Sequence, residues 1–169
     1  MITPDYLVRM AAYNRWQNRS IYGAADTLTS EARRQDRGAF FRSIEGTLNH
    51  LIWGDEMWLH RFAETPKPSG TIQESASRIE KWEDLKKERA ALDEAITAWA
   101  EGVDSEWLAG DLVWFSRAAG REFRQSRAVL VVHFFNHQTH HRGQVHAMLT
   151  AAGAKPEDTD LILMPGLFQ

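Results

Sequence analysis

Two histidines spaced four residues apart, His137 and His141, are the feature of this sequence with the most direct chemical meaning. On a helix, residues at this spacing project from one face about one turn apart, so their imidazoles can hold a single metal ion. An isolated pair of this kind more often occurs by chance, with both side chains in solvent or hydrogen-bonded within the core and no metal bound. Here, five of the seven histidines fall within residues 133–146, and the same face continues into apolar Met148 and Leu149. Buried imidazoles need a compensating partner, which favours a metal site.

A third ligand is expected from another helix, because two ligands leave an ion under-coordinated. His50 is the best candidate, since a glycine stands one turn to either side of it, Gly46 and Gly54. A glycine within a helix costs roughly 1 kcal/mol relative to alanine. The pair therefore indicates either space for a cavity and a metal beside His50, or close helix packing. Asp55 and Glu56 lie near this ligand, but neither has the i+4 relation to it, and no general base is predicted.

The polar residues that flank the histidine pair have weaker interpretations. Gln144 is predicted either to orient water bound to the metal or to pack as an amide between helices. His133, one turn before the pair, is predicted mainly as part of a cavity wall, with a role beside the ligands as the alternative. We expect His140 and His146 to lie on the surface, and Arg142 to form a salt bridge or anchor the helix end.

A first helix begins near the amino terminus, where residues 3–5 read Thr-Pro-Asp, a pattern typical of helix starts. Its apolar stripe has heptad-like spacing only if Asn14 and Gln17 occupy the two middle positions. Two amides are therefore predicted to face the core. There they either reach the metal site or hydrogen-bond to each other.

Two further helices follow from the same periodicity. Residues 29–42 break the helical pattern and are predicted as a connection. A second helix begins near Ser43 and ends at residues 65–70, which are rich in proline, serine and glycine. A third helix is predicted over residues 75–101, with Gly102 as its stop and a charged, solvated outer face.

The last third of the chain contains a break and then a fourth helix. Residues 111–125 lose the helical period and are predicted as a short β-hairpin or looped arm. Ser126 is predicted to cap the fourth helix, which Gly153 and then Pro156 end. The apolar tail, residues 161–168, is expected to pack on the bundle or against a partner chain. The sequence thus predicts an all-α fold, a four-helix bundle with an arm between helices three and four.

Length and composition narrow the classes of function. The 169 residues, 43% hydrophobic and 25% charged, suit one globular domain over residues 1–169. A net charge of −3 argues against a nucleic-acid partner. The absence of cysteine excludes thiolate ligands and disulfides. No apolar run is long enough for a membrane span and no secretory signal is present, so we expect a soluble, cytoplasmic protein without a membrane partner.

Three motifs resemble those of the DinB/YfiT-like superfamily of four-helix-bundle metalloproteins. Residues 136–144 (Asn-His-Gln-Thr-His-His-Arg-Gly-Gln) look like its last-helix motif, which is the most specific of the three. Residues 47–50 (Thr-Leu-Asn-His), with Trp58 downstream, look like its helix-two motif. Residues 13–16 (Tyr-Asn-Arg-Trp) resemble its first-helix signature. The resemblance covers nearly the whole chain.

The resemblance implies that three histidines bind a divalent metal, namely His50, His137 and His141. Three neutral imidazoles leave an ion its full charge and an open position, as in catalytic zinc sites, and zinc, nickel and ferrous iron all accept imidazole. In characterised relatives the chemistry is that of a low-molecular-weight thiol, such as mycothiol, bacillithiol or glutathione. We therefore predict a metal-dependent enzyme that activates a thiol or water, as a thiol transferase or hydrolase.

Two other functions stay open at this point. A non-catalytic metal-binding or small-ligand-binding protein, such as a stress-response module, would have a sealed site with a fourth protein ligand. A scaffold that uses its tail and arm would bind no metal. For the enzyme and for the non-catalytic binding protein, the expected partner is a small-molecule substrate or a thiol cofactor. The apolar tail favours a homodimer.

Overall fold

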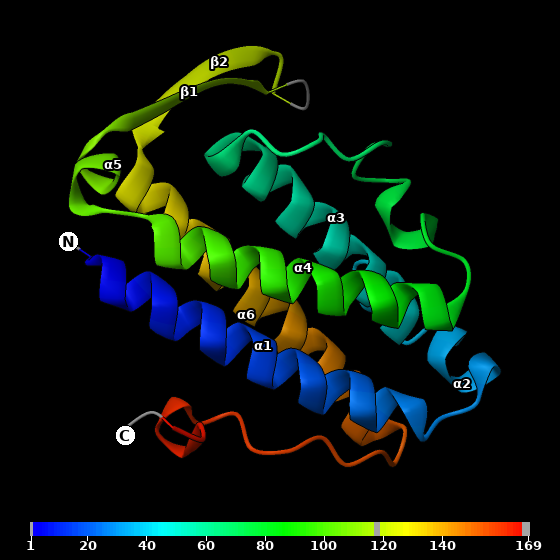
Figure 1. Ribbon diagram of the computed structural model, residues 1–169. Helices are drawn as coiled ribbons and strands as arrows, with labels where there is room; N and C mark the ends of the chain where they lie inside the picture. Colours follow the sequence, from blue (N-terminus) through cyan, green and yellow to red (C-terminus); the bar gives the residue numbers. More distant parts are fainter. Residues whose placement is uncertain (1, 117–118, 167–169) are drawn as a thin grey trace.

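Long helices make up most of this protein, whose computed structural model describes residues 2–116 and 119–166. The four long helices are α1 (Pro4–Asp26), α3 (Ile44–Ala63), α4 (Trp82–Gly102) and α6 (Arg127–Ala151). They lie side by side, with α1 against α4 and α6, and α3 against α6 and α4 (Figure 1). A small two-stranded sheet accompanies them, so the fold is mostly helical, as predicted. None of the helices in the described residues is long and apolar enough to cross a membrane.

The connection before α3 contains a helix that the sequence pattern did not predict. Residues Ser30–Arg34 form the short helix α2, and the Thr29 hydroxyl caps it by accepting from the backbone N–H of Ala32. Ser43 then caps α3, with its Oγ accepting from the N–H of Gly46 at 3.0 Å. The predicted start of the second long helix is therefore confirmed.

The predicted helix over residues 75–101 is wrong at its amino-terminal end. Residues Ser75–Ser77 form a separate 3₁₀ turn, η1, and α4 begins only at Trp82. The Asn49 side chain explains the break, because its Oδ1 accepts from the N–H of Ile79 at 2.9 Å and its Nδ2 donates to the Ile79 carbonyl at 3.1 Å. A side chain that takes both backbone groups of a residue competes with the helical hydrogen bonds there.

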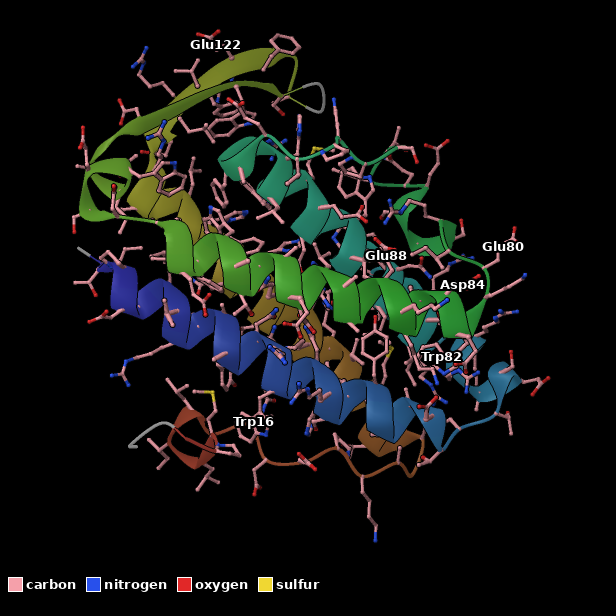
Figure 2. The ribbon with its side chains drawn as sticks, in the orientation of Figure 1. Trp16, Glu80, Trp82, Asp84, Glu88 and Glu122 are labelled. Carbon is pink, nitrogen blue, oxygen red and sulfur yellow. The ribbon has the colours of Figure 1, made fainter. Side chains whose placement is uncertain are left out.

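The outer face of α4 is charged and solvated, as predicted. Asp84 and Glu88 are exposed on it, close to the point where the helix begins (Figure 2). Beyond the end of α4, residues Ser105–Ala109 form the short helix α5, which periodicity did not reveal. The Asp104 carboxylate caps α5 by accepting from the N–H of Trp107 at 2.7 Å.

The predicted arm is a β-hairpin. Strands β1 (Asp111–Ser116) and β2 (Arg121–Ser126) pair antiparallel, with Trp114 opposite Phe123 and their rings stacked 5.3 Å apart. The hairpin lies beyond the end of α3 (Figure 1), and the Trp114 ring contacts the Trp58 ring of that helix. The arm is thereby fixed against the helices by aromatic contact.

The carboxyl-terminal segment runs along α1 after α6 ends. Gly153, with φ +83°, turns the chain away from α6, as predicted. The segment is held by polar contacts, including the Tyr13 hydroxyl donating to the Thr159 carbonyl at 2.6 Å, and by burial of Ala154 and Met164. Its apolar residues Ile162 and Leu163 remain 68% and 51% exposed, so the tail packs only in part on the helices. Residues 167 and 168, which the tail prediction included, lie outside the described residues.

A buried polar network crosses the space between the long helices. Arg89 of α4 forms ion pairs with Asp55 of α3 at 2.7 Å and with Asp93 at 2.9 Å. Asn14 of α1 donates to Asp93 at 3.2 Å, and its Oδ1 accepts a hydrogen bond from Arg142 of α6. All five residues are at most 6% exposed. Four helices are therefore linked through hydrogen-bonded charges rather than through apolar contact alone.

Candidate metal centre

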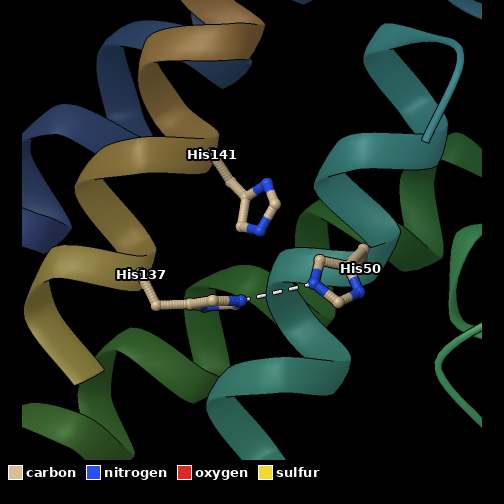
Figure 3. Close-up of side chains that lie close together, drawn as sticks. All are labelled: His50, His137 and His141. Carbon is tan, nitrogen blue, oxygen red and sulfur yellow. Dashed lines mark hydrogen bonds between the residues drawn. The ribbon is translucent and has the colours of Figure 1, made fainter. Parts of the chain in front are cut away.

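Three histidines converge between α3 and α6. Each of them offers one ring nitrogen to a group of three that lie within 4.8 Å of one another, and the three residues are His50, His137 and His141. His50 comes from α3, while the other two project from one face of α6, so the rings point toward a common space (Figure 3). His50 Nε2 and His137 Nε2 are in hydrogen-bond contact at 3.3 Å. The structure thus brings together the three residues that the sequence selected as metal ligands.

Gly54 creates the space that His137 occupies. A Cβ atom at this position would lie 2.9 Å from Cε1 of the His137 ring, closer than real Cβ contacts allow. Gly46 has a different role, because a Cβ there would meet the backbone carbonyl of Phe41. The two glycines that flank His50 therefore serve two purposes, and only Gly54 makes room at the histidine cluster.

Ser75 determines which nitrogen of His50 is free. Its hydroxyl donates to the Ile72 carbonyl at 2.6 Å, and the same Oγ lies 2.9 Å from His50 Nδ1. Since the hydroxyl proton is already used, Oγ accepts from Nδ1–H, and the lone pair of His50 resides on Nε2. This is the nitrogen that faces the other histidines. Nothing in the sequence pattern marked Ser75, which was expected to begin a helix.

Gln144 plays the corresponding part for His141. Its Oε1 lies 2.8 Å from His141 Nδ1, and its Nε2 lies 3.2 Å from His140 Nε2. An amide oxygen only accepts, so His141 carries its proton on Nδ1 and keeps Nε2 free. A partner on the second ring nitrogen is typical of metal-ligating histidines. The contact is neither of the two predicted roles, since Gln144 holds a ring of its own helix; the orientation of metal-bound water by Gln144 stays a prediction.

His137 is held differently. Its Nδ1 is buried and has no hydrogen-bond partner among the described residues. The ring is positioned instead by the surface of Gly54 and by its neighbours in the cluster, with ring centres 4.5 Å from His141 and 5.3 Å from His50. Packing and the contact of its Nε2 with His50 Nε2 at 3.3 Å therefore position this imidazole, whereas the other two rings are also held at Nδ1, by Ser75 and by Gln144 (Figure 3).

Burial keeps the three imidazoles neutral. Loss of solvent lowers the pKa of His50 to about 3 and that of His137 to about 3, with repulsion from neighbouring histidines adding to the effect. Burial also lowers the pKa of His141, although the hydrogen bond to Gln144 opposes the shift. Neutral imidazole is the form that binds metals. At pH 7 the cluster thus presents lone pairs and not positive charges.

Aromatic rings enclose the cluster on the side of the loop before α3. Phe41 stacks on His50 with ring centres 3.7 Å apart and meets His141 edge-on at 5.5 Å. Trp53 also stacks on His50, with ring centres 6.1 Å apart. Phe41 had no recognisable signal in the sequence, because it lies in a segment without helical periodicity.

The nearby carboxylates are engaged elsewhere. Asp55 pairs with Arg89, and Glu56 pairs with Arg78 at 2.7 Å. Within residues 2–116 and 119–166, no fourth histidine, aspartate or glutamate joins the cluster. The arrangement accordingly offers three neutral ligands and no free carboxylate.

The remaining residues that the sequence associated with the site lie at different depths around it. His133 is exposed, with its ring centre 6.0 Å from that of His137 and 5.0 Å from that of Trp58, in keeping with a wall position. Asn14 belongs to the buried network around Asp93. Gln17 is buried as predicted, but it donates to the Asp158 carbonyl of the carboxyl-terminal segment at 2.9 Å. The two amides therefore neither contact the histidines nor pair with each other.

One pair of nitrogens in the cluster has the separation expected around a divalent ion, and all three ligand nitrogens lie within 4.8 Å of one another. Two imidazole nitrogens bound to one tetrahedral zinc at 2.0–2.1 Å would be roughly 3.3–3.4 Å apart. The observed separation of 3.3 Å between His50 Nε2 and His137 Nε2 agrees with this value. In both His50 and His141, the nitrogen that keeps its lone pair for a metal is Nε2.

The fold and the cluster together correspond to mostly helical proteins with a possible three-histidine metal site between two helices. The sequence profile of the DinB family matches residues 1–166, and the chain belongs to this family. Protein DinB of Bacillus subtilis (strain 168) is 28% identical over 163 residues, which cover 92% of this chain and 91% of that protein. The resemblance inferred from the motifs is thereby confirmed at the level of the family.

Proposed function

We propose that this DinB-family protein binds a divalent transition metal through His50, His137 and His141 and acts as a metal-dependent enzyme on a thiol or on water. The observation that carries the proposal is the convergence of three neutral imidazoles without a fourth protein ligand in the described residues. A site of three protein ligands with an open position is the catalytic pattern, whereas structural sites are closed. In this proposal the four long helices are a four-helix bundle that carries its metal in the core.

When bound, the ion would supply Lewis acidity, by which it acidifies water or stabilises a thiolate. The protein's own groups have simpler tasks. Ser75 and Gln144 hold two rings by their Nδ1 atoms and so direct both Nε2 lone pairs to one point. Phe41 covers one face of His50 and excludes water from it. Among the described residues, the two carboxylates that follow His50 on α3, Asp55 and Glu56, are engaged by Arg89 and Arg78 and are not available to take a proton.

The substrate belongs to the proposal as well. The superfamily resemblance points to a low-molecular-weight thiol, such as mycothiol, bacillithiol or glutathione, and to thiol transfer or hydrolysis as the reaction. Zinc, nickel and ferrous iron are all compatible with three imidazoles. A second copy of the chain is the proposed protein partner, supported by the exposed apolar residues Ile162 and Leu163.

One observation favours a second function, metal binding without catalysis. His50 and His141 are only 5% and 8% exposed, and aromatic rings cover part of the cluster. A site this enclosed would also suit a stress-response protein in which the ion stabilises the fold or a small ligand is held. Substrate turnover by the metal-loaded protein separates the two functions.

Elemental analysis of untagged protein, purified without a nickel column, tests the proposal. We expect a near-stoichiometric transition metal in the wild type and in His140→Ala, whose imidazole is exposed. The metal should be lost in His50→Ala, His137→Ala and His141→Ala. Equal losses in all four variants would mean that the ligand face is misassigned. Wild-type protein that contains no metal and takes up no added zinc, nickel or iron would overturn the proposal.

A further inference from the structure

A row of aromatic rings leads from the histidine cluster to the hairpin. The ring centre of His133 lies 6.0 Å from that of His137 and 5.0 Å from that of Trp58. Trp58 in turn meets Trp114 of β1 edge-on at 6.0 Å. These side chains come from α6, α3 and β1, so three separate segments of the chain form one continuous wall beside the candidate metal centre.

Arg61 lies at the far end of this wall. Its guanidinium group stands 4.6 Å from the centre of the Trp58 ring and 5.7 Å from that of Trp114. Both tryptophans are half-buried, and so is Arg61 itself. Cation–π contacts of this kind hold the planar group in place and leave its N–H donors free for other partners.

No carboxylate pairs with Arg61 in the part of the chain that the structure describes. By contrast, four other arginines that border α3 have acidic partners on that helix; these are Arg33 and Arg34 with Glu45, Arg78 with Glu56, and Arg89 with Asp55. The partial loss of solvent lowers the pKa of Arg61, and no neighbouring charge compensates for it. A cation that is half-buried, oriented and unpaired is a site prepared for an anion from outside the chain.

We propose that Arg61, with His133, Trp58 and Trp114 around it, binds a carboxylate or phosphate group at one end of a ligand whose other end reaches His50, His137 and His141. The proposal deepens the proposed function, on which its second half rests. It assigns the substrate to the class of extended anionic molecules that carry a metal-binding group, with His133, Trp58 and Trp114 beside the part between the two ends.

The length of such a ligand follows from the helix. Gly54 marks the level of His137 on α3, and Arg61 follows it by seven residues, which corresponds to roughly 10 Å along the helix axis. A molecule the size of a small peptide spans this distance, whereas a single amino acid does not. The separation therefore discriminates between short and extended thiols.

The anion site can be tested without any metal. In metal-free protein, titrations with hexanoate, hexyl phosphate and the neutral control hexanol are followed by the indole N–H signals of Trp58 and Trp114 in ¹H–¹⁵N spectra. We expect both anions, or one of the two, to bind more tightly than hexanol, and Arg61→Gln to weaken that binding about tenfold or more. The two anions distinguish carboxylate from phosphate as the preferred group.

The hairpin offers a matched control. Arg121 also stacks on an aromatic ring, that of Phe123 at 4.5 Å, but it is exposed. Arg121→Gln removes the same charge and the same type of contact, and anion binding should be unchanged. Arg61→Lys retains the charge and should keep a measurable part of the preference for anions. Retention in this variant would show that the loss in Arg61→Gln comes from the missing charge and not from misfolding. Equal binding of hexanol and both anions, or equal effects of the two glutamine variants, would overturn the proposal whether or not the protein binds metal.

A second titration tests the link between the two ends. Zinc-loaded protein is titrated with 8-mercaptooctanoate and with 8-mercapto-1-octanol, two thiols of similar length that differ in the terminal charge. The carboxylate should bind about tenfold more tightly in the wild type and in Arg121→Gln. This ratio should fall to about one in Arg61→Gln. An unchanged ratio in Arg61→Gln would show that Arg61 does not receive the far end of a metal-bound thiol.

Discussion

A single hydroxyl group decides how His50 can act. Ser75 accepts the Nδ1 proton of His50 because its own proton is committed to the Ile72 carbonyl. This contact fixes both the tautomer and the orientation of the ring. Supporting hydrogen bonds of this kind raise metal affinity although they never touch the metal.

Removing that hydroxyl should weaken metal binding without preventing folding. Ser75→Ala is expected to lower the affinity for zinc about 10- to 100-fold, which is the usual effect of losing a partner of a metal-ligating histidine. Competition with a chelating dye measures the change. Ser77→Ala, an exposed serine of the same turn, is the control and should bind zinc as the wild type does. Equal affinities for the two variants would show that Ser75 is not needed to orient the ligand.

The histidine pKa values predict how stability depends on pH. In the folded, metal-free protein the pKa values of His50 and His137 are about 3, against about 6.5 in an unfolded chain. Between these values the unfolded state binds more protons, so the free energy of unfolding falls as the pH decreases from about 6.5 toward 3. Urea unfolding of metal-free protein should therefore show a lower midpoint at pH 5 than at pH 7.

A variant without the titrating rings provides the comparison. His50→Ala combined with His137→Ala should lose less stability between pH 7 and pH 5 than the wild type does. Bound metal should also resist release until the pH lies below the ordinary histidine value, since protons compete only where the imidazoles titrate. An identical pH dependence for the double variant and the wild type would contradict the assigned shifts.

At the level of the helices, the packing of α3 against α6 determines the geometry of the site. The two helices approach closely at Gly54, where the ring of His137 fills the space that a side chain would need. Gly54→Ala should displace His137 and reduce zinc affinity about tenfold or more, comparable to losing a supporting contact. The same titration with a chelating dye measures this loss.

Gly143 of α6 is the matched glycine, because a Cβ atom there meets nothing within 4 Å. Gly143→Ala should leave zinc affinity unchanged and raise the free energy of unfolding by about 0.5–1 kcal/mol, through the better helix propensity of alanine. If Gly54→Ala behaved in the same way, the close approach of the two helices would not be needed for the site.

The buried network between the helices should be sensitive to the loss of one charge. Arg89 neutralises both Asp55 and Asp93, and all three are almost fully buried. Arg89→Met would leave two buried carboxylates without a counter-charge, which typically costs about 3–5 kcal/mol. Urea unfolding at pH 7 measures the loss, and Arg15→Met, which breaks an exposed pair with Glu94, should cost less than about 1 kcal/mol.

The elements that the sequence predicted best are those with a local signal. Ser43 marks the start of α3, and Gly153 the end of α6, because caps and stops depend on a few adjacent residues. The start of α4 could not be predicted, since the interruption comes from Asn49, thirty residues earlier in the chain. Helix α5 is short and depends on one cap at Asp104, too little for periodicity to reveal.

The same distinction applies to the site. The three histidines were recognisable because two share a local spacing and the third stands between glycines. Ser75 and Phe41 were not, because each reaches His50 only through the folded chain. The interpretation of Gly46 as space for a metal was wrong, since its neighbour is the Phe41 carbonyl. Asn14 was correctly placed in the core, but its acidic partner lies on α4.

For the molecule as a whole, the carboxyl-terminal segment is the exposed apolar feature that bears on assembly. Ile162 and Leu163 are more than half exposed, and we expect them to contribute to a homodimer. Sedimentation should show a dimer for the wild type at micromolar concentration and a shift toward monomer for Ile162→Glu combined with Leu163→Glu, with the zinc affinity unchanged. A monomeric wild type would contradict the proposed assembly. The cytoplasmic location stays a prediction from the sequence.

Eighty-seven residues separate His50 from His137 along the chain. A growing polypeptide therefore displays a single one of the three ligands until most of the protein has left the ribosome. Acquisition of an ion by all three would be an event of maturation, after the helices have met, and the newly made protein must first exist as an apo form. Because the pKa values of His50 and His137 are lowered, the imidazoles of the metal-free form are neutral at pH 7. The empty cluster therefore does not destabilise the folded protein by charge repulsion.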